Sequence, residues 1–255
     1  MGWVSTGNTS IAPSPLSGTG LTYAPPLYPL TLVGWIYFKP GVTCSSPFLD
    51  AYTNASSYCN TMDIVNGTLQ TCGNTYTYYP GTNGLITSLG GAVTAGSWCM
   101  CGVSWTTSKT LLYCYNSAQG KEYYSSAGAV GTAGATVKGF GWFGGNSAYA
   151  VSGNALYSNI SVFATAFNGQ ADFTELARGL SPIDFAVIRQ KNLWMYLPLK
   201  SNYQQFGSVG NSFYVWSANA PRWGADAPVR NPIRHFPMKS SVVLPTYSTS
   251  ASVYL

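Results

Sequence analysis

The sequence predicts an all-β protein that carries one short helix, and three observations support this prediction. Side chains between Ala155 and Thr165 alternate with the two-residue period of a strand. The run from Leu30 to Phe38 is apolar at nearly every position, which is typical of a strand covered on both faces. Asn66-Gly67 separates two strand-like runs and favours a tight hairpin turn. With 255 residues, the chain is long enough to bury a large β core.

Further strands are expected in short runs that turn residues separate. Those before the helix cover residues 48–52, 61–65, 68–72, 97–105 and 110–116. The last two are joined by a Thr-Thr-Ser turn, and a second Asn-Gly pair, at Asn83, indicates another tight turn. The Gly- and Ala-rich stretch 127–135 is expected to be a loop, and the apolar run 193–199 is expected to be a strand.

The segment from Phe140 to Pro182 is predicted to form a strand, a turn, a second strand and then the helix. Asp172 followed three residues later by Glu175 fits a capping box at the start of this helix. Gly179 and then Pro182 are typical of a helix end. No equally strong helical pattern occurs elsewhere in the sequence.

The two ends of the chain differ in composition from its middle. Residues 1–29 are rich in Gly, Ser, Thr and Pro, and residues 207–255 contain many Pro, Asn and Arg with only brief apolar runs. We therefore expect an N-terminal arm over 1–29, a β domain over 30–206 and a C-terminal arm over 207–255. An arm that packs poorly on its own domain needs a partner to become ordered.

Charged residues make up only 7% of the chain, against roughly 25% in an average soluble protein. The surface must therefore be covered by hydroxyls, amides and aromatic rings, as in a protein that is built into an assembly or that meets sugars. The formal net charge is +5, but no basic stripe runs along the chain, and a nucleic-acid partner is not expected. Four of the twelve Lys and Arg residues lie in one C-terminal segment, where we expect subunit contacts through Arg222, Arg230, Arg234, His235 and Lys239.

Targeting signals are not expected from this sequence. The first ten residues contain neither a basic region nor the apolar core of a secretory signal. No run approaches the roughly 20 apolar residues of a membrane helix. We expect a soluble polypeptide without a membrane partner.

The cysteines are expected to be mostly reduced packing residues, because a secretory signal is missing. There are six of them, Cys44, Cys59, Cys72, Cys99, Cys101 and Cys114. A bridge among the first three is the favoured exception. Cys99 and Cys101 lie two apart in a strand, so their side chains point the same way and are poorly placed to bond each other. The sequence has a single histidine and no pair of cysteines with metal-ligand spacing, which disfavours zinc.

Four stretches of the sequence carry a resemblance to a known family. They are residues 30–40, 95–116, 155–183 and 193–199, and together they resemble the concanavalin A-like, laminin-G-type jelly roll. The resemblance covers about residues 28 to 206 and implies a sandwich of two antiparallel sheets with one short helix. The helix exit that ends Gly-Leu-Ser-Pro at Pro182, with the later Tyr-Leu-Pro-Leu strand, resembles proteins on tailed-bacteriophage particles. This implies a place on the virion exterior after assembly in the host cytoplasm.

Enzymatic chemistry is not expected from the residues present. Glucanases of the resembled fold cluster carboxylates on one strand, because one acts as nucleophile and another as acid. The only glutamates here are Glu122 and Glu175, and the second is explained as a cap. A hydrolase triad is equally unsupported, since His235 is the only histidine and no Gly-x-Ser-x-Gly elbow occurs. We expect no enzyme and no catalytic residue.

Cofactors and metals are likewise not expected. The glycines lack the Lys-Ser or Lys-Thr that completes a phosphate loop. Laminin-G-like domains sometimes hold calcium at the rim of a sheet, and Asp50, Asp63 and Asp172 are the residues available for it here. Structural roles in turns, strand ends and a helix cap are favoured for these three residues.

Two functions from different classes follow. The first is a structural virion protein, a capsid decoration or a head or tail fibre component, whose arms bind neighbouring subunits of itself or of other virion proteins. The second is a glycan-binding module for attachment to a host surface. Its candidate contact residues are aromatic and amide side chains in expected loops, namely Tyr76, Tyr78, Tyr79, Asn83, Trp142 and Asn146.

Overall fold

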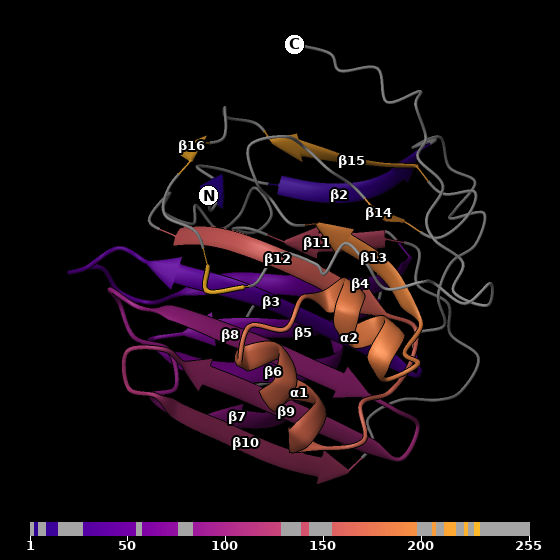
Figure 1. Ribbon diagram of the computed structural model, residues 1–255, viewed down its shortest axis with the longest axis horizontal. Coiled ribbons are helices and arrows are strands. Elements are labelled where there is room, and N and C mark those ends of the chain that lie inside the picture. The colour runs from indigo at the N-terminus through magenta and orange to yellow at the C-terminus, as the bar shows by residue number, and fades with distance from the viewer. Residues whose placement is uncertain are drawn as a thin grey trace.

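The protein consists mainly of β-strands in two antiparallel sheets, which two short helices accompany. The computed structural model describes residues 3–4, 9–14, 28–54, 58–75, 84–128, 139–142, 155–197, 206–207, 212–217, 222–223 and 227–229. The expected all-β class is therefore confirmed. Figure 1 shows the helices in front of one sheet and the second sheet behind it.

The first sheet, sheet A, has nine strands. Its main path is β10 (Lys121–Gly128), β9 (Lys109–Asn116), β8 (Trp98–Trp105), β3 (Leu30–Phe38), β12 (Ala155–Phe163), β1 (Trp3–Val4) and β16 (Arg222–Trp223). Off this path, β13 (Leu193–Leu197) pairs with β12 and with β14 (Phe206–Gly207).

The second sheet, sheet B, has seven strands. Its order is β15 (Ser212–Ser217), β2 (Thr9–Ser14), β11 (Gly139–Trp142), β4 (Ser46–Asn54), β5 (Tyr58–Val65), β6 (Thr68–Thr75) and β7 (Leu85–Leu89). Parts of both expected arms are strands of these sheets: β1 and β2 come from residues 1–29, and β15 and β16 come from residues 207–255.

The two sheets pack face to face around one apolar cluster. Sheet A contributes alternate residues of β3 and β8, such as Leu32 and Val103, and sheet B contributes Phe48, Met62 and Leu69. Burial of this apolar surface is the main favourable term in folding. Two packed antiparallel sheets are thus shown, whereas the jelly-roll connectivity stays a prediction.

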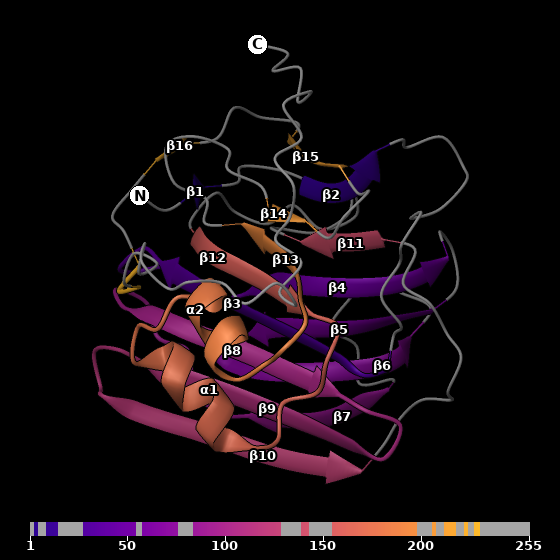
Figure 2. The ribbon, with the colours of Figure 1, turned by 45° about the vertical axis from the view of Figure 1, so that its right-hand side comes forward.

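The helices α1 (Gln170–Ala177) and α2 (Pro182–Ile188) cover the outer face of sheet A. Both views place them in front of the strands of that sheet (Figures 1 and 2). Phe173 of α1 stacks on Tyr113 of β9 with ring centroids 5.2 Å apart, and Phe185 of α2 packs on Phe163 of β12. The inner strands β3, β8 and β12 of sheet A are therefore buried on both faces, which explains their continuous apolar sequences.

The predicted capping box of α1 is wrong. The helix begins at Gln170 after Gly169, which makes no side-chain capping bond, so Asp172 lies within the first turn. Glu175 forms an ion pair with Arg189 instead of reaching back to the helix start. Gly179 has a φ of 92°, and its amide bonds to the Leu176 carbonyl, as the expected helix end requires.

The expectation of a single helix is also wrong, because α2 follows at once. Ser181 is its N-cap and accepts a hydrogen bond of 3.1 Å from the Asp184 amide. Pro182, expected to stop a helix, is the first residue of this one, a position where its missing N–H costs nothing.

The segment from Phe140 to Pro182 does not form a strand pair, since β11 belongs to sheet B and β12 belongs to sheet A. The expected alternation within β12 is interrupted at Asn159, whose φ is 50° and where the register with β3 shifts. This bulge turns Tyr157 and Ile160 to the same interior side, although they are three residues apart.

Most other predicted strands are present, and the Asn66-Gly67 turn is confirmed by φ angles of 48° and 77°. Strand β10 was not expected, because its Tyr-, Ser- and Gly-containing sequence has no apolar alternation. It begins before the loop predicted at 127–135 and pairs with β9 along its whole length.

Valine in place of Gly102 in β8 should loosen α1 from sheet A. A Cβ atom at this position would lie 2.6 Å from Cε1 of the fully buried Phe173, and the ring is held by its stacking on Tyr113. Overpacking of this kind costs about 1–3 kcal/mol of unfolding free energy, measured by urea denaturation. Gly128→Val in β10 is the control, since a Cβ there meets no atom within 4 Å. Equal denaturation midpoints for the two variants would contradict the close packing of α1.

Candidate functional site

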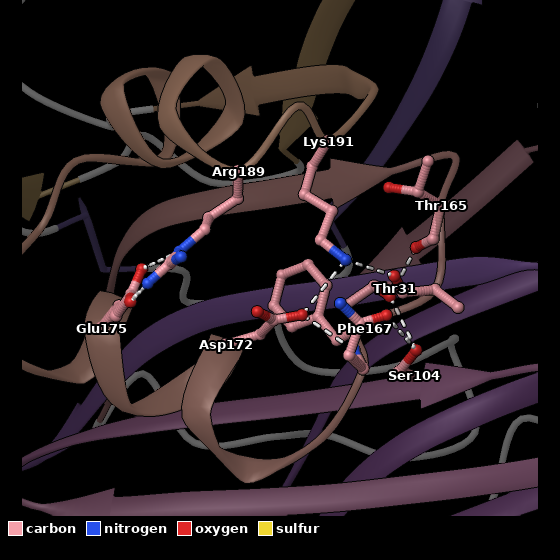
Figure 3. Close-up of polar contacts among 10 residues, drawn as sticks. Thr31, Ser104, Thr165, Phe167, Asp172, Glu175, Arg189 and Lys191 are labelled. Atoms are coloured by element: carbon pink, nitrogen blue, oxygen red, sulfur yellow. Dashed lines mark hydrogen bonds and ion pairs between the residues drawn. The ribbon is translucent and has the colours of Figure 1, made fainter.

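The two helices are joined to sheet A by a polar cluster, which we call the helix joint (Figure 3). Its centre is a nearly buried ion pair in which Lys191 Nζ lies 3.1 Å from Asp172 Oδ2, with side-chain exposures of 9% and 11%. Lys191 also donates a hydrogen bond of 2.9 Å to the Ala166 carbonyl, and Asp172 accepts one of 2.8 Å from the Asn168 amide. Both charges therefore have several partners, as burial requires.

Hydroxyl groups of sheet A also belong to the helix joint, on the side that faces the sheet. The Thr31 hydroxyl lies 2.8 Å from both the Ser104 hydroxyl and the Thr165 carbonyl oxygen. Ser104 in turn accepts a hydrogen bond of 3.1 Å from the Phe167 amide (Figure 3). These bonds fix the turn between β12 and α1. Because its two charges and the hydroxyls of Thr31 and Ser104 are engaged in these contacts, the helix joint is a structural element that positions the helices.

A second polar group, the Glu122 shelf, lies where α1 passes over β9 and β10. It comprises Tyr115, Glu122, Tyr124 and Gln170. Glu122 Oε2 accepts hydrogen bonds of 2.8 Å from Gln170 Nε2 and 2.7 Å from the Thr174 hydroxyl. Both tyrosines and Glu122 are only half-buried, and Gln170 is exposed, so this shelf is open to solvent.

Tyr113 lies beneath α1, next to this shelf, and is shielded from solvent. Tyr113 is fully buried and its hydroxyl makes no hydrogen bond. Burial raises the pKa of Tyr113, the nearby Thr174 hydroxyl opposes this rise, and the negative charge of Glu122 adds to it. This phenol therefore stays protonated at physiological pH.

The most unusual polar side chains lie on sheet B. Met62 and Ile64 of β5 belong to the interior cluster. Thr61 and Asp63 alternate with them along the strand, so their side chains point to the opposite face of sheet B. Both carboxylate oxygens of Asp63 and the Thr61 hydroxyl are buried without a hydrogen-bond partner. Burial raises the pKa of Asp63 to about 7, and the nearby Thr61 hydroxyl opposes the rise. Asp63 can therefore hold a proton in mildly acidic solution.

The thiols of sheet A lie in the interior cluster. Cys99 and Cys101 do share one face of β8, as expected, and Cys101 Sγ lies 4.0 Å from Cys114 Sγ on the neighbouring strand. Cys101 and Cys114 are free thiols. Cys44 is also a free thiol, so it takes no part in the bridge expected among Cys44, Cys59 and Cys72. Burial raises the pKa of Cys101 and of Cys114. They are packing residues with little thiolate character.

The site residues predicted from the sequence lie almost entirely outside the described residues. Only the backbones of Trp142, in β11, and Arg222, in β16, are described. The others are Tyr76, Tyr78, Tyr79, Asn83, Asn146, Arg230, Arg234, His235 and Lys239. Their roles stay predictions. The Glu122 shelf was missed because its members are spread over β9, β10 and α1, and only the strand pairing brings them together.

Within the described ranges, no group of three or more His, Cys, Asp or Glu side chains is placed to hold a metal ion. Neither of the two short helices there has the length and apolarity that crossing a membrane requires.

No protein-family model matches this chain, and no curated protein matches it. Among solved structures, full-length tailspike protein 2 of an Escherichia coli bacteriophage is 14% identical with a TM-score of 0.46, over 69% of this chain and 24% of the tailspike. Trypanosoma rangeli sialidase is 14% identical with a TM-score of 0.35, over 55% of this chain and 21% of the sialidase. Scytalido-glutamic peptidase is 12% identical with a TM-score of 0.28, over 66% of this chain and 68% of the peptidase. This chain thus spans only a minor part of the tailspike that it resembles.

The expectation that this chain is not an enzyme is corrected by these neighbours. Besides the sialidase and the peptidase, they include a tailspike domain described as enzymatically active, at 12% identity and a TM-score of 0.45, over 72% of this chain and 28% of the tailspike domain. The expectation rested on missing glucanase and triad motifs. Such motifs are specific to their families, so their absence does not exclude another catalytic arrangement.

Removing the charge of Lys191 should destabilise the protein strongly. Lys191→Met leaves the Asp172 carboxylate nearly buried without its cation, which costs about 3 kcal/mol of unfolding free energy in urea. The double variant Lys191→Met, Asp172→Asn should recover part of this loss. Arg189→Ala is the control, because its side chain is 48% exposed and its ion pair with Glu175 is worth less than about 1 kcal/mol. Equal losses for Lys191→Met and Arg189→Ala would contradict this assignment of the helix joint.

Asp63 should make folding stability depend on pH. Its pKa is raised from 3.8 to about 7 in the folded protein, so the folded state binds the proton more tightly than the unfolded state does. The stabilising effect of the proton is complete below about pH 4 and is lost as the pH rises to about 7. Denaturant midpoints between pH 4 and 8 should fall less steeply for Asp63→Asn than for the natural chain. Identical slopes for the two proteins would contradict the raised pKa.

Proposed function

We propose that this chain is a virion-associated module of a tailed bacteriophage that contributes to attachment of the particle to its host. The observation that carries the proposal is the helix exit ending at Pro182 together with the strand that follows it, which resembles virion proteins. In the structure this exit is the short connection that packs α1 and α2 on sheet A. The structural neighbours, with TM-scores below 0.5, add no weight to the assignment.

The described exterior suits contact with an uncharged surface. The exposed edge strand β10 presents Tyr, Ser and Gly with only two charged residues, and β7 at the edge of sheet B presents none. The hydroxyls of Thr87 and Ser125 lie 2.6 Å apart and join these two edges. A surface of this kind binds through hydrogen bonds and ring contacts, which salt screens only weakly.

The terminal segments supply the contacts with the rest of the particle in this proposal. Among their described residues, β1, β2, β15 and β16 add strands to both sheets. The basic residues of the C-terminal segment are the proposed subunit contacts, namely Arg222, Arg230, Arg234, His235 and Lys239.

Particle composition and adsorption together test this function. Mass spectrometry of purified phage particles should detect the chain in many copies, and an excess of purified chain should slow adsorption of the phage to its host at least several-fold. Heat-unfolded chain at the same concentration is the control. A folded chain that is absent from particles and leaves adsorption unchanged would contradict the proposed function.

A further inference from the structure

The Glu122 shelf combines two aromatic rings with a fixed carboxylate on one face of a sheet. Tyr115 lies directly opposite Glu122 across the pairing of β9 and β10, and Tyr124 lies two residues further along β10. Side chains at i and i+2 of a strand share a face, so Tyr124 stands beside Glu122 on the outer face of β10. The Tyr115 ring meets Trp35 edge-on, with ring centroids 6.4 Å apart, on the side of β9 away from β10. Tyr124 also packs at the rim of the apolar cluster beneath the helices, which fixes the base of its ring.

The carboxylate of this shelf is held in place with acceptor capacity to spare. The hydrogen bonds from Gln170 and Thr174 both end on Oε2, and no other described residue donates to Oε1. A carboxylate has about four acceptor sites, so at least two remain open on Glu122. The Gln170 side-chain carbonyl is a further open acceptor on an exposed residue. Fixed acceptors bind a ligand at a lower entropic cost than mobile ones do.

The charge of the shelf restricts the ligand. Within the described residues Glu122 forms no ion pair, and the adjacent Lys121 lies over the Tyr123 ring instead, 4.4 Å from its centroid. Tyr123 packs against the interior cluster, on the other face of β10. An anionic ligand would therefore meet an unscreened negative charge, whereas neutral hydroxyl groups would meet hydrogen-bond acceptors.

We propose that the Glu122 shelf binds a neutral pyranose ring of a glycan. The apolar C–H face of the sugar lies on the ring of Tyr124, and its hydroxyl groups donate to Glu122 and Gln170. Such a ligand matches an aromatic ring that stands beside hydrogen-bond acceptors, and it requires no cation. This inference rests on the proposed function, for which it names the class of molecule recognised on the host.

Variants of the shelf test the inference on the full chain. The probe is an array of neutral and sialylated glycans, and each hit is then titrated as free oligosaccharide by protein-observed NMR. The natural chain should bind at least one neutral glycan and no sialylated one. Tyr124→Ala should weaken that binding at least tenfold, and Glu122→Gln should weaken it several-fold because a carboxylate accepts more strongly than an amide does. Thermal unfolding of each variant verifies that it is folded.

A matched variant separates the shelf from the rest of the same face. Tyr37→Ala removes another half-buried tyrosine on the outer face of sheet A, three strands away from β10, and should leave glycan binding unchanged. Binding that survives in Tyr124→Ala and Glu122→Gln, binding that prefers sialylated glycans, or no binding to any glycan would each overturn the inference. None of these results contradicts the proposed function, which is judged by the presence of the chain in particles and its effect on adsorption.

Discussion

Everything in this protein depends on the burial of sheet A on both of its faces. Sheet B covers one face and the helices α1 and α2 cover the other, so β8 and β12 are buried along their entire length. A sheet in this position can carry few polar side chains, because a buried polar group without a partner is costly. Thr31, Ser104 and the Thr165 carbonyl are partners of one another, whereas the buried hydroxyls of Thr110 and Tyr113 have no partner among the described residues. The short helices are stable because they pack on this sheet, since isolated helices of their length are not.

The acidic side chains of the described residues have different roles because their surroundings differ. At the helix joint, Lys191 and Asp172 are nearly dry and specify where the helices sit. On sheet B, Asp63 is buried without a hydrogen-bond partner, which makes it sensitive to pH. At the Glu122 shelf the carboxylate faces solvent, and its negative charge disfavours anionic ligands. Three acidic residues thus have three roles because their surroundings differ.

The strands could be predicted from sequence wherever an apolar period or an Asn-Gly turn was present, as in β3, β8, β9 and the β5–β6 hairpin. The failures have physical causes. The bulge at Asn159 shifts the alternation of buried side chains in β12, which is regular in the sequence. Strand β10 forms because it pairs with β9, and its sequence has no apolar alternation. The second helix was recognisable in principle, since Ser181, Pro182 and Asp184 have the order of a helix start. The Glu122 shelf was not, because pairing register is a property of the folded chain.

The packing of the cysteines affects how easily their thiols are oxidised. Oxidation of a thiol proceeds through its thiolate, and burial suppresses the thiolate at Cys101 and Cys114 although their sulfur atoms are in contact. An oxidant that arrives by diffusion also finds no exposed sulfur at these positions. We therefore expect Cys101 and Cys114 to keep the same covalent state in reducing and in oxidising surroundings.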